Sequence, residues 1–103
     1  MAVGIARNLG TDAVATGHVC SSVTTTNTGS SNVRLNGKGF VRLGDINTPH
    51  TAPPFPLCPS HSVAMSTNTV PNVRVNGLPI AKLGSAYGAE VIISASSNVR
   101  TNS

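Results

Sequence analysis

The stretch SNVRLNGKGFVRLGD, residues 31–45, decides the fold because the chain repeats it. Residues 71–85 read PNVRVNGLPIAKLGS, a match at a period of 40 residues with no gap. Each copy has a short run rich in β-branched residues, an Asn-Gly pair and a second run. Both Asn and Gly tolerate a positive φ, so Asn-Gly between such runs is among the strongest local signals for a β-hairpin. We expect one hairpin from each copy.

A third copy is divided between the two ends of the chain. Residues 97–103, SNVRTNS, match the first half of the repeat, and residues 3–12, VGIARNLGTD, match the second half with one residue inserted. If the two ends pair, they make a third hairpin and close a ring of three units that leaves no lone strand edge. No stretch has a convincing helical period. The sequence predicts a compact all-β domain, residues 1–103, with pseudo-threefold symmetry.

The composition indicates that this domain needs a stabilising element besides its apolar core. A chain of 103 residues has room for one domain, and its core material includes no Trp, one Tyr and two Phe. Small domains with thin cores usually need disulfides, a metal or oligomerisation. No apolar run approaches the ~18 residues of a membrane-spanning helix, and the first residues lack a secretory signal. We therefore expect synthesis and folding in the cytoplasm, where stable disulfides are rare.

The basic residues follow the repeat. Arg34, Arg74 and Arg100 share one repeat position, while six of the seven bases in total are symmetry mates. The other set is Arg7, Arg42 and Lys82. Nucleic-acid readers commonly combine clustered bases with stacking aromatics, which are nearly absent here. We expect no nucleic-acid partner, and solvated or Asp-paired strand residues instead.

Side chains that bind metals follow the second run of each unit. His18 comes after the first unit and His50 after the next, while the third unit has Glu90 at the corresponding place. Threefold placement would bring His18 and His50 towards a common axis. The second connection adds Cys58 and His61, a C-x-x-H pair. Three histidines and one cysteine form a closed tetrahedral set for Zn²⁺, which we favour over iron.

The predicted metal ligands are therefore His18, His50, Cys58 and His61. Pro53, Pro54, Pro56 and Pro59 fix φ in the connection that carries three of them, so these ligands lose less freedom on converging.

Two alternatives compete with a structural zinc. A Cys20–Cys58 disulfide would stabilise the fold by roughly 4 kcal/mol through loop closure, against about 10–16 kcal/mol for a structural zinc site. We prefer zinc because it also explains the histidines, which leaves Cys20 as a spare thiol or a competing ligand. A catalytic zinc, with Asp45 as the base, would need an open position for water. Four protein ligands argue against it, so we expect no enzyme.

At this point the residues resemble a known family. The runs GIAR (4–7), GFVR (39–42) and PIAK (79–82), each followed by L-G or N-L-G, are similar to the Pro-Ala-Ala-Arg motif of PAAR-repeat proteins. The "GD…H" connection after residue 43, "TGH" at 16–18 and "CPSH" at 58–61 add to the likeness, which covers nearly the whole chain. None of the copies is literal. Gly84-Ser85 replaces the usual Gly-Asp, so we expect a different loop in the third unit.

The resemblance implies a sharp cone with a zinc near its apex, held by three His and one Cys. Such a cone caps the trimeric β-helical spike of a contractile injection device, which is a phage tail, a bacteriocin-like particle or a type VI secretion system. One cone would sit on each spike trimer and meet the target cell envelope transiently. Some family members carry effector extensions; this chain stops at its last repeat, so we expect none.

The repeat supports the same mechanics, because one chain with three like units can contact three identical subunits in near-equivalent ways. We expect the metal end to lead, while the Asn-Gly end or the adjoining strands face the spike. The alternative is a free-standing zinc-stabilised interaction module that recruits an effector or binds a surface.

Overall fold

The structure is a computed structural model that describes residues 3–18, 20–51 and 57–101. These residues form short strands: β1 (Val3–Gly4), β2 (Ala13–Ala15), β3 (Val23–Thr25), β4 (Arg34–Leu35), β5 (Lys38–Gly39), β6 (His50–Thr51), β7 (Ser60–His61), β8 (Val70–Val75), β9 (Leu78–Ile80), β10 (Ala86–Tyr87), β11 (Glu90–Ile92) and β12 (Arg100–Thr101). The all-β prediction is confirmed. The described part of the chain contains no helix long and apolar enough to cross a membrane.

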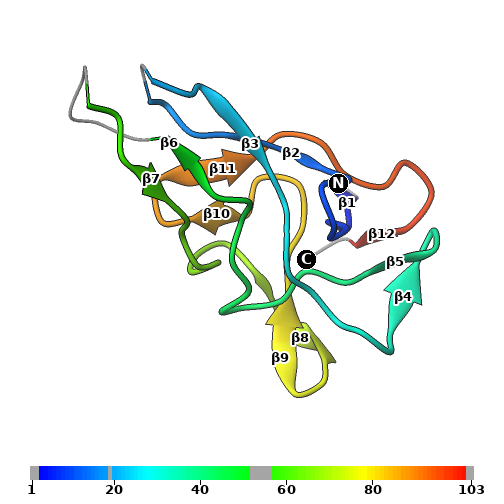
Figure 1. The fold of residues 1–103 in the computed structure, drawn as a ribbon. Helices are drawn as coiled ribbons and strands as arrows, with labels where there is room; N and C mark the ends of the chain where they lie inside the picture. The colour runs from blue at the N-terminus through cyan, green and yellow to red at the C-terminus, as the bar shows by residue number, and fades with distance from the viewer. Residues whose placement is uncertain (1–2, 19, 52–56, 102–103) are drawn as a thin grey trace.

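The predicted hairpins form at the expected residues. β4 pairs with β5 across Asn36-Gly37, and β8 pairs with β9 across Asn76-Gly77. All four turn residues have a positive φ, between 51° and 81°, as a tight hairpin turn of the primed type requires. The remaining hairpin joins the two ends of the chain: β1 pairs antiparallel with β12, with Val3 opposite Thr101 (Figure 1).

A ring of backbone hydrogen bonds joins the three hairpins. The amide of Ala6 donates to the carbonyl of Ala81, that of Ala81 to Val41, and that of Val41 back to Ala6, at 3.1, 2.8 and 3.4 Å. These residues occupy one repeat position and are fully buried. Three antiparallel bridges between neighbouring units flank them, namely Ile5 with Lys82, Arg7 with Phe40, and Arg42 with Ile80. Pseudo-threefold symmetry is therefore present in the main chain.

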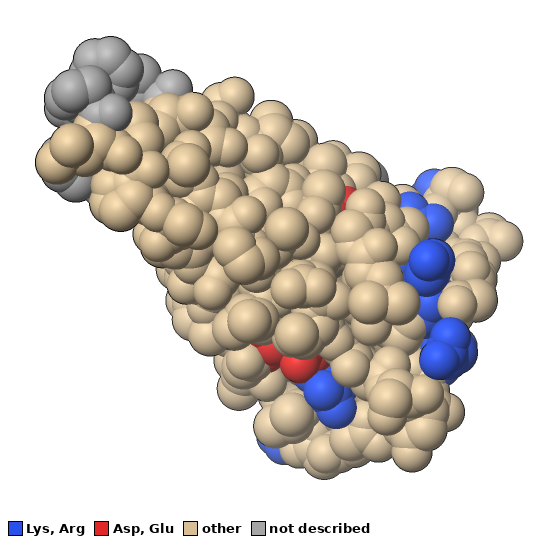
Figure 2. All heavy atoms as spheres, in the orientation of Figure 1, with Lys and Arg blue, Asp and Glu red and all other residues tan. Residues whose placement is uncertain are grey.

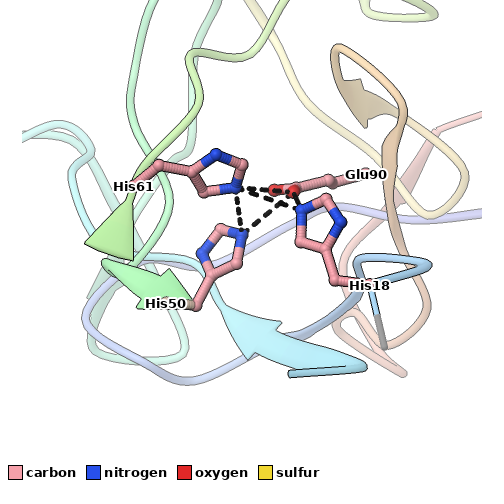
Figure 3. A group of neighbouring side chains, drawn as sticks. All are labelled: His18, His50, His61 and Glu90. Atoms are coloured by element: carbon pink, nitrogen blue, oxygen red, sulfur yellow. Dashed lines mark hydrogen bonds and ion pairs between the residues drawn. The ribbon is translucent and has the colours of Figure 1, made fainter. Parts of the chain in front are cut away.

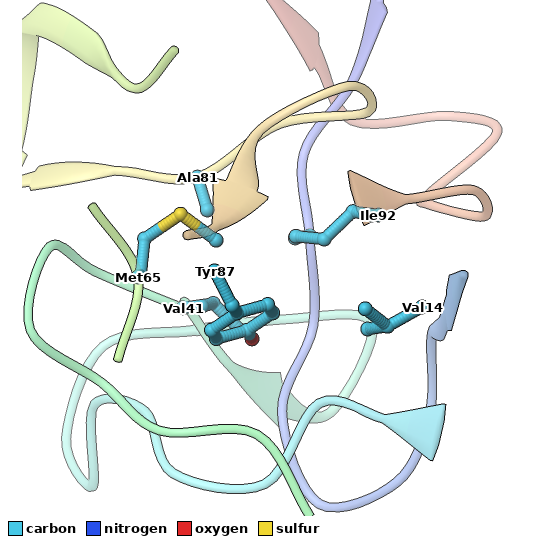
Figure 4. Packing of buried hydrophobic residues seen from close by; sticks show 7 residues of the cluster. Val14, Val41, Met65, Ala81, Tyr87 and Ile92 are labelled. Atoms are coloured by element: carbon cyan, nitrogen blue, oxygen red, sulfur yellow. The ribbon is translucent and has the colours of Figure 1, made fainter. Parts of the chain in front are cut away.

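Two apolar clusters lie along the ring. One contains Ala6, Val14, Val41, Met65, Ala81, Tyr87 and Ile92 (Figure 4). The other lies under the hairpins and contains Ile5, Leu35, Val70, Val75 and Ile80. Branched aliphatic residues supply most of both clusters, as the composition indicated.

The unit of residues 71–85, here called the third unit because it follows 3–12 and 31–45 along the chain, departs from the other two at its first strand, β8. Gly4 and Gly39 lie so close to a neighbouring backbone that a Cβ would come within 2.2 Å of the Ser96 carbonyl and 2.0 Å of the Ser30 carbonyl. The third unit has Pro79 at this repeat position, and there the β8–β9 register shifts between Val70 and Arg74. The shift makes room for a side chain that the other units exclude.

Beyond the ring, the chain runs into three arms: β2–β3, β6–β7 and β10–β11. The third arm also pairs with the first, because β11 lies beside β2. The connection in the β10–β11 arm is tight, since Tyr87 and Glu90 pair directly across Gly88, whereas Ser85 keeps the same turn as Asp45 does in its unit. The molecule measures 41 × 28 × 21 Å and tapers from the hairpin end to the end of the arms (Figure 2).

Candidate metal centre

All three arms contribute to one cluster of side chains inside the narrow half of the molecule. His18 follows β2, His50 begins β6, and Glu90 begins β11. His61 lies directly opposite His50 in the β6–β7 ladder. Directly opposed residues of an antiparallel pair project to the same face, so the ladder itself brings these two imidazoles together. Figure 3 shows the four side chains converging.

The cluster is tight enough to surround a single ion. The Nε2 atom of His61 lies 3.1 Å from that of His18 and 2.9 Å from that of His50. The Oε2 atom of Glu90 lies 2.5, 2.9 and 3.1 Å from the Nε2 atoms of His18, His50 and His61. One ligand atom from each residue falls within 4.8 Å of all the others, so the group could hold a metal ion.

The tautomer of His50 favours a cation at this point. Its Nδ1 lies 2.8 Å from the carbonyl oxygen of Thr48, which can only accept a hydrogen bond. Nδ1 therefore carries the proton, and in neutral His50 the Nε2 atom presents a lone pair to the carboxylate of Glu90. Two facing lone pairs repel unless a proton or a metal ion lies between them. A backbone acceptor on the far nitrogen is also the usual partner of a metal-binding histidine.

The carboxylate of Glu90 is buried but well supported. Asn47, which is fully buried, donates from Nδ2 to its Oε1 at 2.8 Å and accepts the amide of Val63 at 2.9 Å. Burial raises the pKa of Glu90, but the polar contacts with His50, Asn47 and His61 outweigh this and leave that pKa below its ordinary value. The charged form of Glu90 is thus the one that the site stabilises.

Three of the four predicted ligands meet as expected, and the fourth does not. His18, His50 and His61 share the cluster, whereas Cys58 is bonded to Cys20 in a disulfide. A disulfide sulfur carries no thiolate charge, so Cys58 is not available as a metal ligand in this structure. The disulfide that we considered a rival to the metal site therefore exists beside it. Pro53, Pro54 and Pro56 lie outside the described residues.

Glu90 is the member of the cluster that the sequence-based prediction of ligands did not include. Its repeat position is equivalent to those of His18 and His50, and this symmetry was the signal that could have identified it. The C-x-x-H spacing was given more weight, although His61 reaches the cluster through its register with His50. The spacing from the end of each repeat therefore identifies Glu90 better than the C-x-x-H spacing identifies Cys58.

Two of the basic strand residues, which the sequence predicted to be solvated or Asp-paired, are paired with aspartates. Arg7 binds Asp12 with Nη2 to Oδ1 at 2.6 Å, and Arg42 binds Asp45 with Nε to Oδ2 at 2.9 Å. Each carboxylate also accepts the backbone amide of its arginine, at 2.6 and 2.8 Å. In the third unit the hydroxyl of Ser85 accepts the amide of Lys82 at 2.9 Å, so serine keeps the turn without the charge.

The arrangement therefore combines three imidazole nitrogens and one carboxylate oxygen between three arms, two of which, β2–β3 and β6–β7, are also joined by a disulfide. Such a set can bind a divalent cation and fix the arms relative to one another. A scan of the sequence against protein-family models and a search of curated proteins found no match.

Proposed function

We propose that this protein is a structural tip: a metal-stiffened cone that caps a trimeric β-helical spike and takes part in piercing a target envelope mechanically. The observation that carries the proposal is the ring formed by Ala6, Val41 and Ala81. It gives a single polypeptide a threefold axis, with one hairpin per unit around it. A threefold trimer offers three identical surfaces, and this chain can match each of them with an equivalent hairpin.

The shape supports the same function. The broad end carries the hairpins and the basic side chains visible on this face, and the narrow end carries the arms (Figure 2). In the proposed assembly the broad end faces the spike and the narrow end leads. The resemblance of the sequence to PAAR-repeat proteins points in the same direction.

The ion that we propose for the cluster is zinc. Three histidine nitrogens with one carboxylate are ordinary tetrahedral zinc ligands, and zinc needs no redox partner. His50 and Glu90 are buried, which suits an ion that holds structure. The role of the ion would be to fix His18, His50 and His61 in one geometry, and so to stiffen the narrow end against load. No catalytic step is proposed for it.

The decisive experiment is binding to a trimeric β-helical spike fragment from a contractile device of the same genome. Native mass spectrometry should find one copy of this chain per spike trimer, and metal analysis of the purified protein should find about one zinc per chain. Failure to bind any such trimer, with zinc present, would favour the free-standing interaction module. Hydrolytic turnover that is lost on chelation would overturn the structural assignment.

A further inference from the structure

Each acidic side chain of the protein already has a basic or histidine partner. The sequence contains only three Asp and Glu residues. Asp12 pairs with Arg7, Asp45 pairs with Arg42, and Glu90 lies among the histidines. No acidic side chain therefore remains for the bases on the hairpins.

Three arginines on the hairpins occupy the same repeat position and the same side of their strands. Arg34, Arg74 and Arg100 are exposed. The next residue along the strand points inward in two of the units, where Leu35 and Val75 are buried. Each guanidinium donates to a nearby backbone carbonyl, those of Gly37, Gly77 and Ser97, at 3.0–3.3 Å. A guanidinium has five N–H donors, so one such bond leaves donors that can bind a carboxylate in a bidentate way.

Two of these arginines line grooves that are themselves symmetry mates. Arg34 lines a groove of about 320 Å³ together with Leu9 and Gly39. Arg100 lines a groove of about 430 Å³ together with Leu83 and Gly4. Leu9 and Leu83 correspond in the repeat, and they are 61% and 39% exposed. Each groove therefore presents an apolar side chain beside a guanidinium. In the β8–β9 hairpin, Pro79 stands where the other two units have Gly39 and Gly4, and Arg74 is exposed like its two symmetry mates.

We infer that Arg34, Arg74 and Arg100 form a threefold docking surface for a protein trimer whose subunits each present one carboxylate beside one apolar side chain. This inference rests on the proposed function and names the chemistry of the partner. The partner should be acidic at these positions, because the protein carries a net charge of +4 and its three acidic side chains are paired elsewhere. Threefold repetition decides its symmetry. The carboxylate would pair with the guanidinium while the apolar side chain packs on Leu9 or Leu83.

The test uses the same trimeric spike fragment and single-residue variants of the zinc-loaded protein. Arg34→Gln, Arg74→Gln and Arg100→Gln each remove one charge from an exposed site, so the melting temperature should not change. Each should weaken binding by at least about tenfold, because it removes a charge-assisted hydrogen bond. Leu9→Ser should weaken it less, by about fivefold, because part of a leucine loses its contact.

Lys38→Gln is the matched control. Lys38 lies in the same hairpin as Arg34 and loses the same charge, but no symmetry mate repeats it. We expect a change of less than twofold. If the wild type binds one copy per trimer and the arginine variants bind like Lys38→Gln, this inference is wrong while the proposed function stands. If the wild type does not bind the spike fragment, the proposed function fails and the inference fails with it.

Two further probes separate other partners of a basic surface. The wild type and the triple arginine variant are titrated with a 20-base-pair DNA duplex and with vesicles that contain phosphatidylglycerol. We expect binding that is at least a hundredfold weaker than to the spike fragment. Tight binding to either probe that the triple variant loses, with spike binding unchanged, would assign the surface to that probe and overturn the protein docking site.

Discussion

The hairpin end and the metal end of this molecule are built on the same threefold plan but by different means. At the hairpin end the three units repeat their sequence, and backbone bonds such as that from Ala6 to Ala81 join them. At the metal end the units supply unlike side chains at equivalent positions, with His18 and His50 in two units and Glu90 in the third. Main-chain symmetry thus tolerates chemical difference, and the difference is concentrated where an ion can be held.

The two ends also differ in what stabilises them. The hairpins cover the buried cluster around Leu35, Val75 and Ile80. In the arms, the buried cluster around Tyr87 and Ile92 packs against the ring, whereas the apolar side chains near the disulfide are exposed: Val23 is 52% exposed and Leu57 is 82% exposed. The narrow end instead has the Cys20–Cys58 disulfide and the histidine cluster. A small domain that buries little apolar surface usually needs a disulfide or a metal site, and here the disulfide and the histidine cluster lie in the same half of the molecule.

Metal removal should produce the largest effect and should separate the two ends. Structural zinc sites have apparent binding free energies of about 10–16 kcal/mol, so chelation should lower the free energy of unfolding by several kcal/mol. Hydrogen exchange should accelerate at β6 and β7, which carry His50 and His61, well before β4 and β5. Isothermal titration with zinc measures the affinity, and chelation followed by exchange measures the local effect.

The variants for this experiment are His50→Ala and Ser62→Ala. His50→Ala removes one ligand and should weaken zinc binding at least a hundredfold. Ser62 is exposed next to His61, and its substitution should leave the affinity unchanged. Equal acceleration of exchange at both ends after chelation would contradict the division between them.

Loss of the disulfide should come next in size. The bond joins residues 38 positions apart, for which loop-closure arithmetic gives about 4 kcal/mol. Cys20→Ser combined with Cys58→Ser should cost nearly that much in metal-free protein and clearly less in zinc-loaded protein. The reason is that the ion and the disulfide restrain the same two connections, so their contributions are not additive. Urea unfolding of the wild type and of the double variant, each with and without zinc, measures the coupling. The same loss of unfolding free energy in both conditions would show that the ion and the disulfide act independently.

At the hairpin end, Gly39→Ala should have a smaller but clear effect. Its Cβ would lie 2.0 Å from the backbone oxygen of Ser30, so the backbone must shift, at a cost of about 3 kcal/mol. Gly37→Ala is the matched control: it lies in the same hairpin with φ +77° and nothing within 4 Å, so it should cost only about 1 kcal/mol. Neither variant should change zinc affinity. A Gly39→Ala protein that lost zinc binding would show that the two ends are coupled more strongly than the structure indicates.

The sequence was informative where structure depends on local signals and on symmetry. Asn36-Gly37 and Asn76-Gly77 require a positive φ, so the hairpins were predictable, and the split repeat predicted the pairing of β1 with β12. The choice between Cys58 and Glu90 depended on the bond of Cys58 to Cys20 and on where β11, paired with β2 and β10, places Glu90. Both follow from strand register and packing, for which the sequence carries no local signal.

Tyr87 lies between the two ends and should show the smallest effect. Its side chain is fully buried, and its hydroxyl has no hydrogen-bond partner among the described residues. Burial raises the pKa of this phenol, and the charges of Asp45 and Asp12 raise it further. A buried hydroxyl without a partner costs free energy, so Tyr87→Phe should stabilise the protein by up to about 1 kcal/mol at neutral pH.

The raised pKa of Tyr87 also predicts a pH dependence. In the unfolded chain the phenol ionises near its ordinary pKa of about 10, whereas the folded protein keeps it protonated. The wild type should therefore lose stability as pH rises above about 10, and Tyr87→Phe should lose less over the same range. Chemical denaturation at pH 7 and at pH 11 measures both effects, and a destabilised Tyr87→Phe protein would show that the hydroxyl has a partner that stabilises the fold.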